Sequence, residues 1–159
     1  MPLMDREARE KMAALVRAER VAALGTLRSE APLVSMVTYL ASPDLSAFHV
    51  HVSRLAWHTQ DMARDARVSM CITERDDGRE DPQTLARLTI RAEATQLPNE
   101  GDDYVALKAA YLARHPAAAI QFELGDFHFW RLAPRDARFV AGFGRIHNLS
   151  AADLCSSSS

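Results

Sequence analysis

The stretch SRLAWHTQDMARDARVS, residues 53–69, places polar and basic side chains directly before a segment with the spacing of an amphipathic helix. Ser53, Arg54, His58 and Thr59 lie where this helix is expected to begin, over residues 54–64. The N–H groups of a first helical turn lack intrahelical acceptors and carry about half a positive charge, so they attract anions. These residue types are compatible with a phosphate site, but taken alone they favour the alternative that Ser53 simply caps the helix.

Histidines lie just before this motif, in AFHVHVS, where Phe48, Val50 and Val52 alternate with His49, His51 and Ser53. Period-two alternation predicts a strand with one buried and one polar face. Together with His58, the two strand histidines would offer three ligands to a metal. No Asp or Glu lies among them, and strand histidines more often bond to neighbouring groups, so we expect no metal site.

Two arginines share one face of the regularly alternating segment ARLTIRAEA, residues 86–94. Arg87 and Arg91 could bind a carboxylate or a phosphate through forked hydrogen bonds. The alternative is a pair of surface arginines that contact Glu93 or the acidic loop ERDDGREDPQT. A second glycine-containing segment, RFVAGFGR, lacks the lysine and the strand–turn–helix setting of a phosphate loop, so we expect it to end a strand in a turn.

Composition narrows the class of protein. The 159 residues are 48% hydrophobic and 25% charged, which suits one globular domain over residues 1–154, followed by a disordered serine tail, 155–159. The net charge of -2 argues against nucleic-acid binding, and no apolar run approaches the roughly 20 residues of a membrane span. Two distant cysteines and an N-terminus of mixed charge predict a cytoplasmic protein.

The order of elements predicts the fold class. Helices are expected over residues 5–18, 54–64 and 102–114, and strands in VAALGTLRSEAPLVSMVTYL (two, joined at SEAP), AFHVHVS, RVSMCIT, ARLTIRAEA, DFHFWRLA and ARFVAGF. About seven strands cluster as hairpins instead of alternating with helices, so a parallel sheet is not expected. The sequence predicts a mainly β protein of the α+β type, an antiparallel barrel decorated by helices.

The series PLVSMVTYL, HVHVSRLAWHTQDMARDARVSMCI, ARLTIRAEATQL and DFHFWRLAPRDARFVAGFGRIHNL resembles the FMN-binding split-barrel family of pyridoxamine 5'-phosphate oxidase-like proteins. It is most similar to the haem-utilisation (HugZ-type) branch, in which a Ser-x-Leu-Ala-x-His-Thr stretch precedes a helix. The resemblance covers about residues 15–150. It implies a six- to seven-stranded antiparallel split barrel that forms a homodimer, with FMN at the subunit interface.

The resemblance also implies roles for particular residues. The FMN ring would be bordered by Ser35, Met36, Val37 and Thr38, and the phosphate would be held by His51, Ser53, Arg54, His58 and Thr59. Arg87 would reach the flavin of the partner subunit. The oxidases have an arginine where this chain has Ser35 and an Arg-Lys pair where it has Trp57-His58, so Arg54 and His58 would have to supply the missing positive charge.

The function that the resemblance implies is an FMN-dependent oxidoreductase with a small-molecule substrate. The oxidase's substrate-binding Arg-x-His-x-Arg ending is not matched by FGRIHNL, so the substrate is not expected to be a vitamin B6 compound. The alternatives are a haem-binding or haem-handling protein, with His147 as a candidate haem ligand, and a flavin-binding protein without catalysis.

Overall fold

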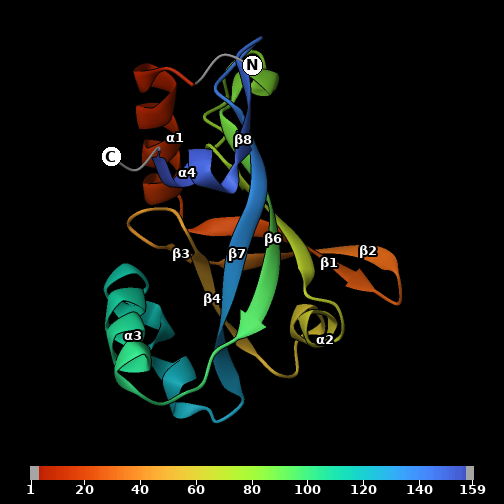
Figure 1. Ribbon diagram of the computed structural model, residues 1–159, viewed down its shortest axis with the longest axis vertical. Coiled ribbons are helices and arrows are strands. Elements are labelled where there is room, and N and C mark those ends of the chain that lie inside the picture. Colours follow the sequence, from red (N-terminus) through yellow and green to blue (C-terminus); the bar gives the residue numbers. More distant parts are fainter. Residues whose placement is uncertain (1–3, 157–159) are drawn as a thin grey trace.

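A single antiparallel sheet organises residues 4–156, the part of the chain that the computed structural model describes (Figure 1). Its strands are β1 (Val21–Arg28), β2 (Ala31–Thr38), β3 (Leu40–Ala41), β4 (Phe48–Ser53), β5 (Arg67–Thr73), β6 (Arg87–Gln96), β7 (Phe127–Val140) and β8 (Ile146–Ser150). Seven strands follow one another in the order β2-β1-β5-β6-β7-β4-β3, and β8 pairs with β7. The predicted antiparallel split barrel is confirmed.

Strand β7 connects the two ends of this sheet. It pairs with β6 along one edge, while its other edge pairs first with β4 and then with β8. Two strands were predicted here, and that prediction is wrong because Pro134 does not interrupt β7. The register with β6 shifts between Arg91 and Ala92, which face Asp136 and Pro134, so the extra residue of a bulge accommodates the proline.

Four α-helices flank the sheet, α1 (Arg6–Ala18), α2 (Trp57–Arg64), α3 (Asp102–Arg114) and α4 (Ala151–Ser156), together with two 3₁₀ segments, η1 (Pro82–Thr84) and η2 (Pro116–Glu123). The helices predicted over 5–18 and 102–114 are confirmed. Asp5 caps α1 by accepting a hydrogen bond from the N–H of Ala8. Helix α4 was not predicted and includes the first two residues of the expected serine tail; the other three, 157–159, lie outside the described residues.

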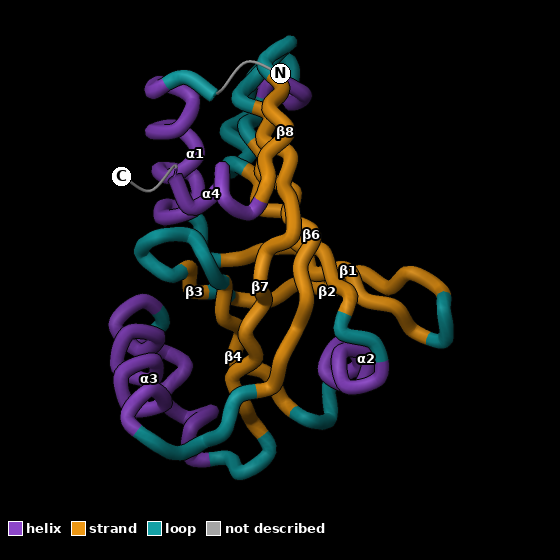
Figure 2. The backbone as a smooth tube through the Cα atoms, viewed as in Figure 1, coloured by secondary structure: helices purple, strands orange, loops and turns teal. Residues whose placement is uncertain are grey.

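Two hydrophobic clusters hold these elements together. The main core lies between the sheet and α1, with residues such as Met12, Leu24 and Ile90 fully buried. A smaller cluster around Tyr111 and Phe129 attaches α3 and η2 to the far end of β4 and β7, where Figure 2 shows these helical segments beside the strands. No helix within residues 4–156 is long and apolar enough to cross a membrane.

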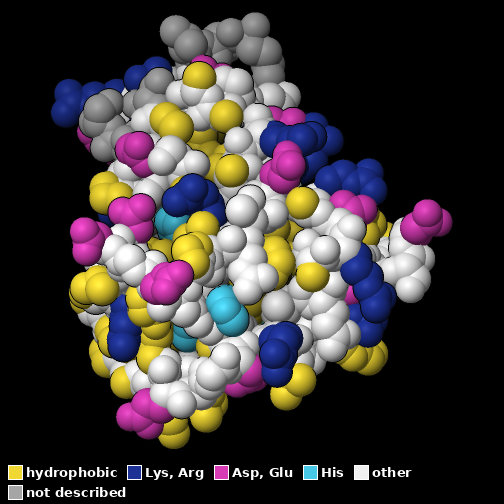
Figure 3. Space-filling view, turned by 60° about the horizontal axis from the view of Figure 1, so that its bottom comes forward, with side chains coloured by type: hydrophobic (Ala, Val, Ile, Leu, Met, Phe, Trp, Pro, Cys, Tyr) yellow, Lys and Arg dark blue, Asp and Glu magenta, His cyan; other side chains and the backbone are white. Residues whose placement is uncertain are grey.

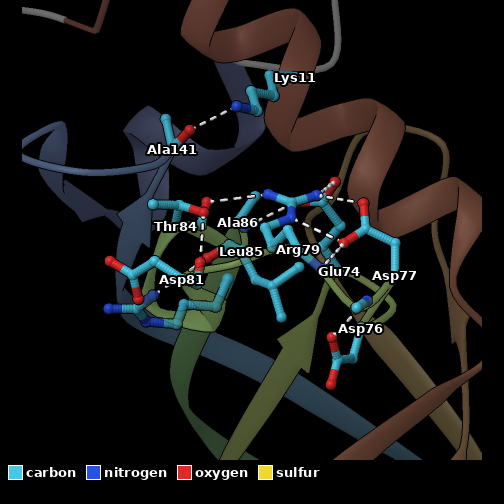
Figure 4. A network of polar contacts seen from close by, with 12 residues as sticks. Lys11, Glu74, Asp76, Asp77, Arg79, Asp81, Thr84, Leu85, Ala86 and Ala141 are labelled. Atoms are coloured by element: carbon cyan, nitrogen blue, oxygen red, sulfur yellow. Dashed lines mark hydrogen bonds and ion pairs between the residues drawn. The ribbon is translucent and has the colours of Figure 1, made fainter.

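The acidic loop between β5 and β6 is ordered by one arginine. Arg79 forms ion pairs with Glu74 at 3.1 Å and Asp77 at 2.9 Å, and it donates a hydrogen bond to the carbonyl oxygen of Thr84 (Figure 4). Glu74 also accepts a hydrogen bond from the N–H of Ala86, next to the start of β6. The loop therefore has a defined conformation where it meets the sheet, although it is exposed as predicted.

Candidate functional site

The start of α2 is an uncapped helix N-terminus. The helix begins at Trp57, three residues later than predicted, and its N-cap residue Ala56 provides no side-chain hydrogen bond. The first turn contains no acidic residue. The first-turn N–H groups therefore have no side-chain cap, which is the arrangement that accepts an anion.

Ser53 does not cap this helix. It ends β4, where its hydroxyl donates a hydrogen bond to Asp126 at 2.5 Å and accepts one from the N–H of Leu55. The N–H of Arg54 donates to the carbonyl oxygen of Asp126 at 2.7 Å. The structure therefore ties this turn to the loop before β7, and the nearby carboxylate of Asp126 makes the Ser53 hydroxyl a poor phosphate ligand. The side chain of Arg54 is exposed.

Two of the predicted site residues meet at the start of α2. The hydroxyl of Ser35 on β2 lies 3.2 Å from Nδ1 of His58, and both side chains are half-buried. Burial lowers the pKa of His58, while the nearby carboxylate of Asp61 acts in the opposite direction. The ring is therefore neutral at neutral pH and can donate one hydrogen bond and accept another.

Thr59 supplies a polar atom that the protein itself does not satisfy. Its side chain is 6% exposed, and its hydroxyl is buried without a hydrogen-bond partner among the described residues. A buried hydroxyl without a partner costs about 1–3 kcal/mol, so such atoms are rare in stable structures. The hydroxyl lies in the same uncapped turn as His58, and together with Ser35 these donors suit the oxygen atoms of a phosphate monoester.

A buried carboxylate behind this turn was not predicted from the sequence. Asp61 is 1% exposed and accepts hydrogen bonds from Thr26 at 2.7 Å and from Arg28 at 2.9 Å. The guanidinium of Arg28 also lies 4.4 Å from the centroid of the Trp57 ring. The sequence signal was an acidic residue on the buried side of α2, next to Met62, where an unpaired charge would be costly.

His51 is enclosed by aromatic side chains instead of facing the start of α2. Its ring stacks on Phe122, with centroids 4.0 Å apart, and Nδ1 lies 3.3 Å from Oε1 of Gln121. The rings of Phe129 and Tyr111 lie at 4.6 and 5.8 Å. In Figure 3, histidine side chains reach the surface between hydrophobic ones at this end of the molecule. His51 therefore links η2 and α3 to the sheet. The prediction that β4 has one buried and one polar face is wrong, because both of its faces are buried.

The remaining predicted ring-binding residues of β2 divide between two environments. Val37 is buried in the main core, and Met36 is 68% exposed. The hydroxyl of Thr38 lies 2.6 Å from that of Tyr111. Ser35 of this run therefore forms a hydrogen bond with α2, whereas Met36 belongs to the exposed side of the sheet.

Both strand arginines, Arg87 and Arg91, form hydrogen bonds within the protein. Arg87 donates hydrogen bonds to the carbonyl oxygens of Gln83 and Leu85, at 2.9 and 3.1 Å, which places its side chain against the ordered loop. Arg91 forms a two-pronged ion pair with Asp136 on β7. Of the two interpretations of Arg91, the surface ion pair agrees with the structure, although its partner differs from those expected.

The histidines do not form a metal centre. Among residues 4–156, no group of three or more His, Cys, Asp or Glu side chains has the arrangement to hold a metal ion. His147 on β8 is half-buried and stacks on Phe139, with centroids 6.4 Å apart. Its Nε2 has no hydrogen-bond partner among the described residues, so the nitrogen that could bind an iron is not used by the protein.

Comparison with known proteins identifies a family and a relative of this chain. A family model described as CREG, beta-barrel matches residues 4–155. The non-canonical heme oxygenase HOZ, chloroplastic, of Arabidopsis thaliana is 34% identical over 111 residues, which are 70% of this chain and 32% of that protein. This chain therefore spans about a third of the length of that relative.

Solved structures show the same architecture. The heme binding protein from Mycobacterium smegmatis has a TM-score of 0.84 and 29% identity, over 97% of this chain and 62% of its own. The protein Atu2129 from Agrobacterium tumefaciens, of unknown function, has a TM-score of 0.76 and 29% identity over the same shares. A putative pyridoxamine 5'-phosphate oxidase from Listeria innocua, at 17% identity and a TM-score of 0.61, covers 84% of this chain and 98% of its own and shares the fold.

The buried histidines make the stability of the fold depend on pH. Burial lowers the pKa of His49 to about 4, with a smaller effect of Arg131, and burial also lowers the pKa of His51. Since their folded-state pKa values lie below the unfolded value of about 6.5, both favour the folded state fully above that pH. This stabilisation is lost progressively as pH falls from about 6.5 toward 4.

We therefore expect the free energy of unfolding to fall by about 2 kcal/mol between pH 7 and pH 5 from His49 alone. Urea denaturation at these two pH values measures the change. The His49→Gln variant should show a shallower dependence, because it removes the larger of the two shifted groups. An equal slope in the variant and the natural protein would contradict this assignment.

Proposed function

Since this chain belongs to the CREG beta-barrel family, we propose that it is an FMN-binding flavoprotein that acts as a homodimer on a small-molecule substrate. The observation that carries the proposal is the uncapped start of α2, where the buried hydroxyl of Thr59 has no protein partner and Ser35 contacts His58. These groups suit a phosphate monoester, the group that distinguishes FMN from riboflavin. The near-neutral charge balance supports a small-molecule ligand over nucleic acid.

The residues of the proposed phosphate site have separate tasks. The N–H groups of the first turn of α2 provide the positive end of the helix dipole, and Thr59 provides a hydroxyl donor. Ser35 and the neutral His58 ring share one hydrogen bond, so one of these two groups, depending on the tautomer of the ring, donates to the phosphate, and exposed Arg54 adds a positive charge. Ser53 and His51 support the site indirectly, by fixing the end of β4 against Asp126 and Gln121.

The bound flavin supplies the two-electron redox chemistry, and the protein supplies binding, orientation and electrostatics. We propose the cytoplasm as the compartment, as expected from the sequence.

The Thr59→Val variant separates ligand binding from stability. Valine has the shape of threonine without the hydroxyl, so it removes a buried polar atom that has no protein partner and should leave stability unchanged or slightly higher. It should weaken FMN binding by roughly 10- to 100-fold, because a hydrogen bond to a charged group contributes roughly 1.5–3 kcal/mol. Titration followed by quenching of flavin fluorescence measures the affinity, and urea denaturation measures the stability.

Riboflavin is the matched control ligand, since it has the same ring without the phosphate. Its affinity should be the same for the natural protein and Thr59→Val. The proposal is wrong if the natural protein fails to bind FMN at micromolar concentration, or if FMN and riboflavin bind equally well.

The exposed side of the sheet supports the proposed homodimer. One row of paired residues crosses the sheet from β2 through β1, β5, β6 and β7 to β8. Its members are Met36, Ala23, Cys71, Thr89, Arg138 and Asn148. Small side chains occupy the middle of this row, and the exposed apolar residues Val34 and Met36, 69% and 68% exposed, lie at its β2 end. A second copy would cover this surface, and Arg87, two residues before Thr89 on β6, lies beside the row.

We expect light scattering after size-exclusion chromatography to give twice the mass of one chain. The Met36→Glu variant should give the mass of a monomer, because it places a charge at the centre of the apolar end of this surface. Val105 on α3 is 64% exposed and lies outside this row, so Val105→Glu should leave the dimer intact. Dissociation by both variants, or by neither, would argue against this interface.

A second candidate function is haem binding. HOZ and the Mycobacterium smegmatis protein are named for haem, and Nε2 of His147 is unused by the described residues. The absorption spectrum of the purified protein with added haem distinguishes the candidates, since a Soret band favours haem. The band should shift in His147→Ala if this residue is the axial ligand, whereas an unchanged band would exclude His147 from that role.

A further inference from the structure

The buried pair of Arg28 and Asp61 lies directly behind the proposed phosphate site. Asp61 sits in the second turn of α2, and its two carboxylate oxygens are taken by different donors on β1. Oδ2 accepts from the Thr26 hydroxyl at 2.7 Å, and Oδ1 accepts from Arg28 at 2.9 Å. The Asp61 side chain is 1% exposed and that of Arg28 is 29% exposed, so solvent screens this pair incompletely.

Arg28 reaches the first turn of α2 as well as the carboxylate. Its guanidinium approaches the carbonyl oxygen of Trp57 at 3.4 Å and Oε1 of Gln60 at 3.3 Å, and it covers the face of the Trp57 ring. One side chain of β1 therefore contacts three residues of α2. The direction in which the first-turn N–H groups point depends on this attachment.

The charge of Asp61 extends to the ligand side of the helix. His58 and Asp61 are three residues apart, so their side chains are neighbours on the surface of α2. The carboxylate raises the pKa of His58 against the effect of burial. A field that favours a proton on His58 also disfavours an anion at the same place.

We propose that the Arg28–Asp61 pair sets the net charge at the start of α2 and thereby determines how strongly the site binds a phosphate dianion. Arg28 cancels the carboxylate that would repel the ligand and orients the first turn; it is a positioning residue and does not contact the ligand. The inference rests on the proposed function for its ligand.

Three variants separate charge from structure. Asp61→Asn keeps hydrogen-bonding oxygen and removes the negative charge, so FMN binding should tighten on the order of tenfold. Arg28→Gln leaves the carboxylate uncompensated and should weaken FMN binding on the order of tenfold. The double variant Arg28→Gln/Asp61→Asn should bind FMN within about threefold of the natural protein, because the two charge changes cancel.

Two controls isolate the electrostatic effect. Riboflavin should bind all these variants alike, since it lacks the phosphate. Arg6→Gln removes the same charge from an exposed pair with Glu10 on α1, where the Arg6 side chain is 92% exposed, and should not change FMN affinity. Unchanged FMN affinity in Asp61→Asn, or equal shifts for FMN and riboflavin, would overturn the inference.

A second measurement needs no ligand. The ring of His58 titrates in an NMR spectrum, and its pKa should fall in Asp61→Asn, rise in Arg28→Gln and return toward the natural value in the double variant. A natural protein that does not bind FMN would refute the proposed function, but the His58 titration would still test the charge effect of the pair. If Arg28→Gln does not fold, the test uses Asp61→Asn and the double variant. A His58 pKa that is the same in Asp61→Asn as in the natural protein would overturn the inference.

Discussion

The attachment of α2 to β1 through the buried carboxylate of Asp61 is the interaction on which the candidate site depends. The helix has only eight residues, and isolated helices of that length are not stable in water. Its packing against β1 is therefore what keeps it folded and oriented. A carboxylate buried in this way must be compensated, and Thr26 and Arg28 provide both a hydrogen bond and an opposite charge. The N-terminal turn can then remain without a cap, because the second turn holds the helix in place.

The sheet brings this attachment together with residues from distant parts of the chain. Strand β1 lies between β2, which carries Ser35, and β5, which follows α2. The hairpin β1–β2 turns at Ser29 and Glu30, both of which have positive φ values of the kind that match the twist of the flanking strands. This tight turn fixes the register in which Ser35 faces Leu24, on the inner side of the sheet. The contact between Ser35 and His58 follows from that register.

Sequence patterns predicted the elements whose periodicity is local, and missed those that depend on distant partners. The alternation of ARLTIRAEA predicted β6 correctly, since each apolar residue is buried and each polar one exposed or half-buried. Strand β7 was divided because Pro134 normally ends a strand, and the bulge that tolerates it forms only against β6. In the site, Ser35, His58 and Thr59 were predicted, but the partner of Ser53 is Asp126, 73 positions further along the chain. Asp61 and Arg28 are 33 positions apart, and no local pattern connects them.

The two candidate cofactors make different demands on this geometry. FMN and haem both carry acidic groups, so an uncapped helix start with hydroxyl donors can accept an arm of either one. Thr59 therefore supports an anionic ligand in general. His147 is different, because its Nε2, which has no hydrogen-bond partner among the described residues, could ligate the iron of haem, whereas a flavin offers no metal to ligate. Both Nε2 of His147 and the hydroxyl of Thr59 are buried, so side chains have to move at either site before a ligand can reach these atoms. The α2 site offers donors besides the Thr59 hydroxyl, namely the first-turn N–H groups and the Ser35–His58 pair, and this larger set is the physical reason for placing FMN first.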